Sequence, residues 1–257
     1  MGNSGQLLKD GHFNMNPASP LDNVRIVLSH TSHPGNIGAT ARAMKAMGLR
    51  NLYLVNPKLF PDKEADARAS NARDLLETAH ICTSLQAAIG DTCLVAALTT
   101  RPRDLSHSTL DARQAASELI RHARHSPVGL LFGRESSGLT TDEISQCQLT
   151  VHIPTHADYS SLNLAAAVQI MGYELWMALK NTAAVTLSEN QAEPASLREV
   201  ENFYAHLEKI MIQSGFLDPQ QPKKLMRRMR RLFARARLEK EEVNILRGIL
   251  SAVDNKK

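Results

Sequence analysis

Short, almost unbroken apolar runs alternate with longer amphipathic stretches over the first 180 residues of the chain. The runs lack the polar–apolar alternation of a half-exposed strand, which favours strands that are covered on both faces. The spacing predicts strands at 24–28, 51–55, 93–98, 128–132 and 149–153, and helices at 37–47, 63–79, 111–125, 141–146 and 161–180. This order is typical of an α/β domain with a parallel sheet and helices on both faces.

The pattern changes after residue 180. Residues 181–196 are mostly small and polar, and they are predicted to form a linker. Ser196 is expected to cap the next helix, with Glu199 completing a capping box and Gly215 marking the helix end. A basic helix at 223–237 and an apolar-striped helix at 243–253 should follow. We therefore expect a flexible leader over residues 1–21, an α/β domain over 22–180 and a small all-α domain over 197–257.

Charge is unevenly distributed between the two predicted domains. Residues 1–180 hold 16 Lys and Arg against 16 Asp and Glu, whereas residues 181–257 hold 14 against 10. The formal net charge of +4 therefore lies entirely in the C-terminal part, where residues 223–237 contain eight basic residues and no acidic one. A neutral domain beside a basic one indicates that one part performs chemistry while the other binds a polyanion.

Composition narrows the class further. No stretch approaches the ~18 apolar residues of a membrane span, and the N-terminus lacks the apolar and basic regions of a secretory signal. Cys82, Cys93 and Cys147 are odd in number and widely spaced, which favours free thiols and a cytoplasmic protein. The closely spaced histidine pairs lack a cysteine or carboxylate in ligand register, so we expect no metal.

Three loops at the predicted carboxyl ends of strands carry unusual residues. The first, His33–Gly38, has two glycines that let the backbone approach a ligand or simply form a tight turn, and Arg42 follows in the next helix. The second, Gly133–Leu139, directly follows an apolar strand. The third, Asp158–Asn163, leads into the long helix and has side chains suited to cap it. In an open parallel sheet, ligands bind at this edge.

The three loops in this order resemble the three motifs of the SPOUT superfamily of RNA methyltransferases, and most closely those of the TrmJ-type tRNA 2′-O-ribose methyltransferases. The segments that carry the resemblance are NIGATARAM, LLFGRESSGL and YSSLNLAAAVQI. The tail FLDPQQPKKLMRRMRRLFARARLEKEEVNILRGIL resembles the C-terminal extension of the same family. The resemblance runs from about residue 22 to about residue 252.

The resemblance implies a fold, a cofactor and a substrate. It implies an α/β SPOUT sheet whose C-terminal part forms a trefoil knot, in a homodimer. It also implies that the knot loops bind S-adenosylmethionine, largely through backbone groups. Transferred to this chain, the cofactor-binding residues are Leu98, Thr99, Thr100, Gly133, Ile153, Ser160, Ser161 and Leu162. The implied substrate is tRNA, methylated on the ribose of a cytidine or uridine at nucleotide 32 of the anticodon loop.

The same resemblance assigns catalytic roles. It makes Arg42 the catalytic residue, and a guanidinium that stays protonated is suited to hold a phosphate and a developing alkoxide, not to act as a base. Ser161 and Asn163 are the residues that would orient the ribose hydroxyl and the methyl donor. Asn36 and Glu135 would line the pocket or have structural roles.

The basic helix is the predicted tRNA-binding element. Its like charges repel one another at helical spacing, which destabilises the helix unless a polyanion neutralises them. The residues expected to contact tRNA are Arg227, Arg228, Arg230, Arg231 and Arg235. The stripe expected to pack inward is Leu225, Met229, Leu232 and Ala236. Two alternatives stay open: a SPOUT methyltransferase that acts on rRNA, and an inactive SPOUT protein that only binds RNA.

Overall fold

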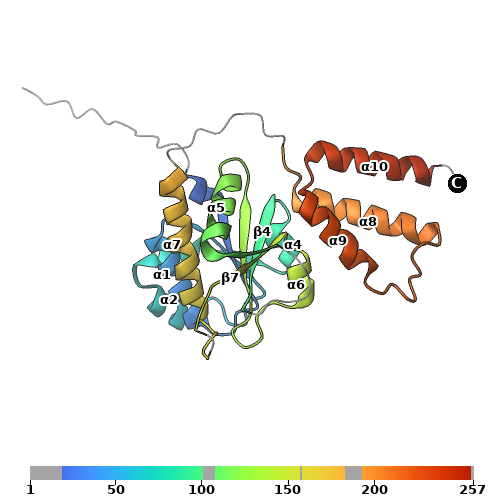
Figure 1. Cartoon of the computed structure of the whole chain (residues 1–257). Helices are drawn as coiled ribbons and strands as arrows, with labels where there is room; N and C mark the ends of the chain where they lie inside the picture. Colours follow the sequence, from blue (N-terminus) through green and yellow to red (C-terminus); the bar gives the residue numbers. More distant parts are fainter. Residues whose placement is uncertain (1–18, 101–107, 157, 183–192, 256–257) are drawn as a thin grey trace, which may run out of the picture.

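A parallel sheet forms the centre of the larger domain (Figure 1). The computed structural model of the chain describes residues 19–100, 108–156, 158–182 and 193–255. The sheet has seven strands in the order β3-β2-β1-β6-β4-β7-β5, and every strand pair is parallel. The strands are β1 (Val24–Ser29), β2 (Asn51–Val55), β3 (His80–Cys82), β4 (Leu94–Leu98), β5 (Ser108–Asp111), β6 (Val128–Phe132) and β7 (Leu149–His152). The predicted α/β fold class is confirmed.

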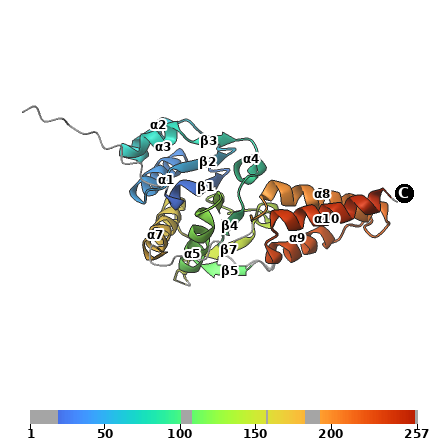
Figure 2. The same cartoon turned by 90° about the horizontal axis from the view of Figure 1, so that it is seen from above.

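Helices cover both faces of this sheet (Figure 2). One face carries α1 (Pro34–Ala46), α2 (Lys63–Ala69), α3 (Arg73–Glu77), α5 (Ala112–Ala123) and α7 (Leu164–Thr182), and the other carries α4 (Leu85–Ile89) and α6 (Thr141–Ser145). Because side chains alternate along a strand, Ile26 and Leu28 join the core under α1 and α7, while Val27 joins the core under α4 and α6. Burial on both faces is the reason why the strands read as continuous apolar runs.

The five strands expected from the apolar runs are present, each within one residue of its predicted ends. The prediction missed β3 and β5, which lie at the two edges of the sheet. An edge strand pairs on one side only and is less covered, so its sequence needs no apolar run. The short helix α4 was missed as well.

Two predicted helices differ in extent from the observed ones. The helix expected at 63–79 is interrupted at Ser70, whose φ of 53° ends α2, and a 3-10 turn at Ser70–Ala72 leads into α3. The helix expected at 161–180 begins at Leu164, because Asn163 caps it from outside: its Oδ1 accepts a hydrogen bond from the Ala165 amide at 2.9 Å.

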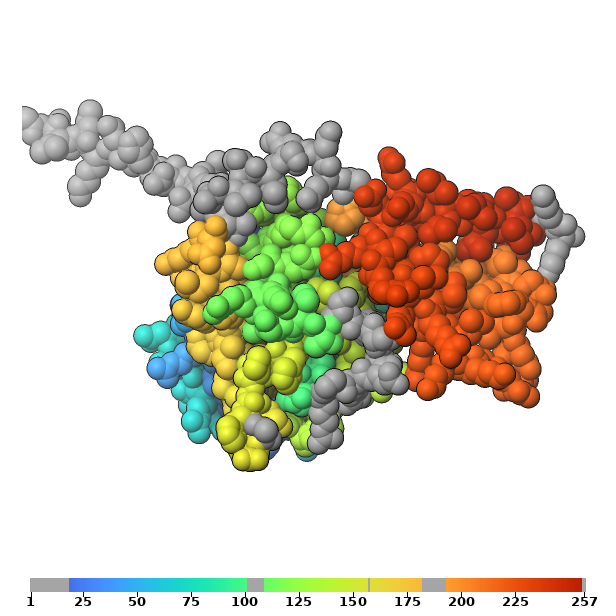
Figure 3. Space-filling view, in the orientation of Figure 1, coloured from blue at the N-terminus to red at the C-terminus, as the bar shows by residue number. Residues whose placement is uncertain are grey.

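The C-terminal extension consists of three helices, α8 (Leu197–Gln213), α9 (Leu225–Ala236) and α10 (Lys240–Asp254). The extension lies beside the sheet domain (Figure 3). Their core contains Phe203, Tyr204 and Val243, and the ring of Phe233 meets that of Phe203 edge-on at 4.9 Å. The predicted capping box is confirmed, since the Ser196 amide donates to the Glu199 carboxylate at 2.8 Å and the Glu199 amide donates back to Ser196 Oγ.

The start of α8 attaches the extension to the sheet domain. The amide of Leu197 donates to the carbonyl of Thr92 at 2.9 Å, and that of Arg198 donates to the carbonyl of Gly90 at 2.8 Å. The Leu197 side chain is buried in the core under α4 and α6. Through Leu197 the extension therefore docks against the α4–α6 side of the sheet, close to the amino end of β4.

The strand order does not trace the path of the connecting segments, so the trefoil knot stays a prediction. Within the ranges that the structure describes, no helix combines the length and the apolarity that crossing a bilayer requires.

Candidate active site

Three polar loops meet at one edge of the sheet. Because all strands are parallel, their carboxyl ends lie at the same edge, and β1, β6, β4 and β7 are consecutive in the sheet. The first loop leaves β1 and enters α1, the second follows β6, and residues 158–163 lead from β7 into α7. The topology thus brings together three segments that are far apart in the sequence.

Glu135 joins the second loop to the first. Its carboxylate accepts hydrogen bonds from the Ser32 amide at 3.1 Å, the Ser32 hydroxyl at 3.0 Å, the His33 amide at 3.2 Å and the Asn36 side-chain amide at 3.0 Å. Partial burial alone would raise the pKa of Glu135, but these donors outweigh it and lower the pKa to about 2. Glu135 is therefore a carboxylate at neutral pH and acts as an acceptor.

Asn36 joins the first loop to the third. Its Oδ1 accepts a hydrogen bond from the Asn163 side-chain amide at 2.9 Å, while its Nδ2 donates to Glu135. Asn163 uses its own Oδ1 to cap α7. The chain Glu135–Asn36–Asn163 thus connects all three loops, and both proposed roles of Asn163, helix cap and site residue, are compatible with its contacts.

The second loop is closed on itself. The Arg134 amide donates to the Gly138 carbonyl at 3.2 Å, and the Gly138 amide donates to the Arg134 carbonyl at 2.9 Å. Gly138 has a φ of 68°, and a Cβ on Gly133 would lie 2.3 Å from the backbone of Gly138. Both glycines are needed for this closure.

The glycines of the first loop lie against α2. A Cβ on Gly38 would lie 2.0 Å from the carbonyl oxygen of Ala65, and one on Gly35 would lie 2.5 Å from the Glu64 carboxylate. The absence of a side chain at Gly38 in particular allows α1 to pack closely on the backbone of α2. A role of these glycines toward a ligand stays a prediction.

Arg42 lies two turns into α1 and is exposed. In the described part of the chain its guanidinium has no hydrogen-bond or ion-pair partner, so no such bond links it to Asn36 or Asn163. Ser161, two residues before Asn163, is likewise exposed and unpaired within the described residues. The fold brings Asn36, Glu135 and Asn163 into contact, but it does not bring Arg42 or Ser161 into the same network.

The predicted cofactor residues form a mixed apolar and polar rim. Leu98, Ile153 and Leu162 are half-buried and pack against the same side of the core. Thr100, Ser160 and Ser161 are exposed beside them. Backbone pairing continues past the strand ends, because the Thr99 amide donates to the Val151 carbonyl at 2.9 Å.

Comparison with known proteins connects these loops to a family. The sequence model of the SpoU rRNA methylase family matches residues 23–173, which include every loop residue described above. A model of the C-terminal domain of the tRNA methyltransferase TrmJ matches residues 198–257.

Individual relatives agree with both matches. The tRNA (cytidine/uridine-2′-O-)-methyltransferase TrmJ of Pectobacterium atrosepticum is 47% identical over 234 residues, which are 91% of this chain and 97% of the relative. That of Yersinia enterocolitica is 45% identical over 237 residues, 91% and 92% of the two chains. The crystal structure of TrmJ from Z. mobilis ZM4 has a TM-score of 0.78 and 31% identity, covering 90% of this chain and 98% of that one. The chain belongs to the SpoU rRNA methylase family, in its TrmJ branch.

In this TrmJ-type chain, the basic helix α9 has two distinct faces. Arg228, Arg231 and Arg235 recur at i, i+3 and i+7, are exposed, and have no side-chain partner within the described residues. The opposite face carries Met226 and Phe233, which pack into the core of the extension. The predicted inward stripe is therefore wrong, since Leu232 is 49% exposed and Ala236 is exposed. The face that turns inward instead carries Phe233, whose ring packs on that of Phe203.

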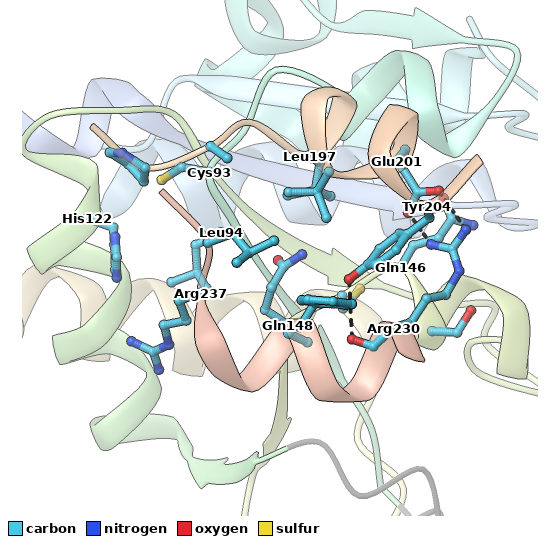
Figure 4. Close-up of a pocket in the computed structure, with 18 residues that line it drawn as sticks. Cys93, Leu94, His122, Gln146, Gln148, Leu197, Glu201, Tyr204, Arg230 and Arg237 are labelled. Carbon is cyan, nitrogen blue, oxygen red and sulfur yellow. Dashed lines mark hydrogen bonds and ion pairs between the residues drawn. The ribbon is translucent and has the colours of Figure 1, made fainter. Parts of the chain in front are cut away.

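Arg230 is predicted from the sequence to face outward, but in the structure it does not. Its guanidinium forms a bidentate ion pair with Glu201 and lies 4.7 Å from the ring centre of Tyr204 (Figure 4). Burial would lower the pKa of Arg230, but the pair with Glu201 outweighs it and raises the pKa. Arg230 is thus a packing residue of the extension.

Two further arginines of this segment contact the sheet domain. Arg227 lies 3.4 Å from the Asp142 carboxylate on α6, and Arg237 pairs with Glu118 on α5. Between the two domains is a cavity of about 70 Å³ at the amino ends of β4 and β7 (Figure 4). This edge is opposite the three loops, and the cavity is too small for a cofactor, whose pockets measure roughly 300 Å³ or more.

Proposed function

We propose that this chain is an S-adenosylmethionine-dependent tRNA 2′-O-ribose methyltransferase that modifies a cytidine or uridine at nucleotide 32 of the anticodon loop. The observation that carries the proposal is the Glu135–Asn36–Asn163 chain, which joins the three loops at the ligand-binding edge of the sheet. The similarity to the tRNA (cytidine/uridine-2′-O-)-methyltransferases TrmJ supports the reaction and the substrate class.

The residues at the sheet edge fit S-adenosylmethionine. Leu98, Ile153 and Leu162 offer aliphatic surface for an adenine ring, and the exposed hydroxyls of Ser160 and Ser161 offer partners for ribose and amino-acid groups. When bound, this cofactor supplies a methyl group on a positively charged sulfur, which becomes a neutral thioether as the ribose oxygen takes the methyl group.

The protein's own residues position the ribose. Arg42 remains protonated and holds the phosphate beside the target, so that it also stabilises negative charge developing on the 2′ oxygen. Asn163, fixed by Asn36 and by its cap on α7, orients the third loop, and Ser161 donates to or accepts from the 2′ hydroxyl. The hydroxyl proton passes to phosphate or water.

We also propose a homodimer with the cofactor site near its interface. Tyr173 on α7 is 49% exposed, and Arg42 projects from the neighbouring helix α1 without a partner in the described residues. A second copy packed on α1 and α7 would cover the tyrosine and place more groups around Arg42.

The decisive experiment is methyl transfer from labelled S-adenosylmethionine to unmodified tRNA transcripts, followed by mapping of methylated riboses. We expect one methylated ribose at nucleotide 32 and none when that nucleotide is a 2′-deoxynucleotide. Methylation of rRNA fragments but not of tRNA would favour the rRNA alternative. Binding of tRNA without cofactor binding would favour the inactive RNA-binding protein.

A further inference from the structure

Glu143 is a buried carboxylate close to the second loop that the reaction above does not use. It lies in the first turn of α6, which follows that loop, and only 8% of its surface is exposed. Its carboxylate accepts hydrogen bonds from Arg134 Nη1 at 2.9 Å and the Thr140 amide at 2.6 Å, and also from the Ser29 hydroxyl. The ring nitrogen Nδ1 of His30 lies 3.7 Å away.

Helix capping explains only part of this arrangement. The reciprocal bonds between Thr140 and Glu143 form a capping box, which requires one bond from the Thr140 amide and no burial. Burying a carboxylate is costly unless its oxygens are satisfied. Here Ser29, at the end of β1, and Arg134, in the second loop, provide additional donors from other segments. Burial raises the pKa of Glu143, but these donors outweigh it and lower the pKa, so the group stays ionised.

Arg134 and its neighbour Glu135 are held in two different places. The Arg134 side chain is bound to Glu143 on α6, whereas the Glu135 side chain is bound to residues 32–36 at the start of α1. The Arg134 backbone also closes the loop onto Gly138. Anchors on both sides limit the conformations of the backbone amides in this loop.

We propose that Glu143 is a positioning residue that, through Arg134, holds the loop 133–139 in the conformation that binds S-adenosylmethionine. The inference rests on the proposed function, because it assigns the cofactor to this loop. Glu143 itself does not touch the cofactor, so its effect on cofactor affinity depends on Arg134.

The test is calorimetric titration of S-adenosylmethionine into the full-length chain. Glu143→Gln should weaken cofactor binding about tenfold, because an amide cannot hold the Arg134 guanidinium as a carboxylate does. Arg134→Gln should have a similar effect, and the double variant should lose little more, since the two residues act as one unit. The affinity for tRNA should stay unchanged.

Two matched controls separate positioning from stability. Thr140→Ala removes the helix cap, and Asp142→Asn removes the neighbouring carboxylate on the same short helix, but both leave the Glu143–Arg134 pair intact. Neither should weaken cofactor binding more than about twofold, even where the melting temperature falls. If Glu143→Gln does not fold, Arg134→Gln provides the same test, because it leaves Glu143 with Ser29 and Thr140.

The outcomes distinguish this inference from the proposed function. If the unaltered chain binds no S-adenosylmethionine, the proposed function fails first. If the unaltered chain binds but both Glu143→Gln and Arg134→Gln bind equally well, the positioning role is wrong. If Thr140→Ala weakens binding as much as Glu143→Gln, Glu143 acts only as a helix cap and the inference is also overturned.

Discussion

Replacing Arg228, Arg231 and Arg235 with Gln should reduce the salt dependence of tRNA binding. These three arginines form the exposed face of α9 and have no side-chain partner in the described structure, so their charges are available to phosphates. Each phosphate contact contributes roughly 0.7–0.9 to the slope of log affinity against log salt concentration. Loss of three contacts should flatten the slope by about two to three units.

The expected change in tRNA affinity can be stated for two salt concentrations. Raising the salt concentration from 50 to 200 mM weakens tRNA binding by both proteins. If each contact contributes as above, the fold-loss of affinity should be about 20 to 40 times smaller for the triple variant than for the unaltered chain. Fluorescence anisotropy with labelled tRNA at four or more salt concentrations measures the slope directly. Binding of S-adenosylmethionine should be unaffected, because the loops proposed to bind it lie at the carboxyl edge of the sheet, away from α9.

Arg230→Gln is the matched control on the same helix. It removes one positive charge, but it also leaves the half-buried Glu201 carboxylate without its partner, at a cost of about 1 kcal/mol of folding free energy. We expect a lower melting temperature and an unchanged salt slope. An unchanged slope in the triple variant, or a flatter slope in Arg230→Gln, would refute the assignment of the two faces of α9.

Three further predictions concern the sheet domain and its contact with the extension. Arg42→Ala should abolish methyl transfer while cofactor affinity changes less than about tenfold (~1.4 kcal/mol); a larger loss in calorimetry would show that Arg42 shapes the cofactor site. Glu135→Gln should lower stability at pH 7 by roughly 1 kcal/mol. Because the pKa of Glu135 is about 2 when folded and about 4.3 when unfolded, the stabilisation is complete above pH 4.3 and is lost as the pH falls toward 2. Thermal unfolding measures the difference in stability between this variant and the unaltered chain. That difference should shrink as the pH falls through this range, and a difference that grows would contradict the reasoning. Glu118→Gln should release Arg237 and speed hydrogen exchange at the Leu197 amide several-fold, whereas unchanged exchange would show that the ion pair does not hold the extension.

The sequence determined much of the sheet and the position of its loops. β1, β2, β4, β6 and β7 are covered on both faces, and such strands must be apolar at nearly every position. Because the strands are parallel, the loops that follow them must lie at the same edge of the sheet. The position of these loops can therefore be predicted from the sequence. The helix start at Ser196 was equally predictable, because a capping box is made by residues three positions apart.

Only the tertiary structure decided how individual polar residues are used. Helical periodicity shows that Arg230 and Arg231 point in different directions, but not which of them meets Glu201, a residue on another helix. The sequence marks Gly38 as part of a strand-to-helix turn, but only the packed structure shows that its missing side chain makes room for Ala65 of α2.

The site network shows the same limit more strongly. Glu135 and Asn36 are 99 positions apart, and Glu143 and Ser29 are 114 apart, so no local pattern relates them. A sequence pattern specifies which residues share a strand end or a helix face, because those relations are set by backbone geometry over a few residues. Which donor reaches which carboxylate depends on how the strands are ordered in the sheet and how the helices pack on it, and those arrangements arise only when the whole chain has folded.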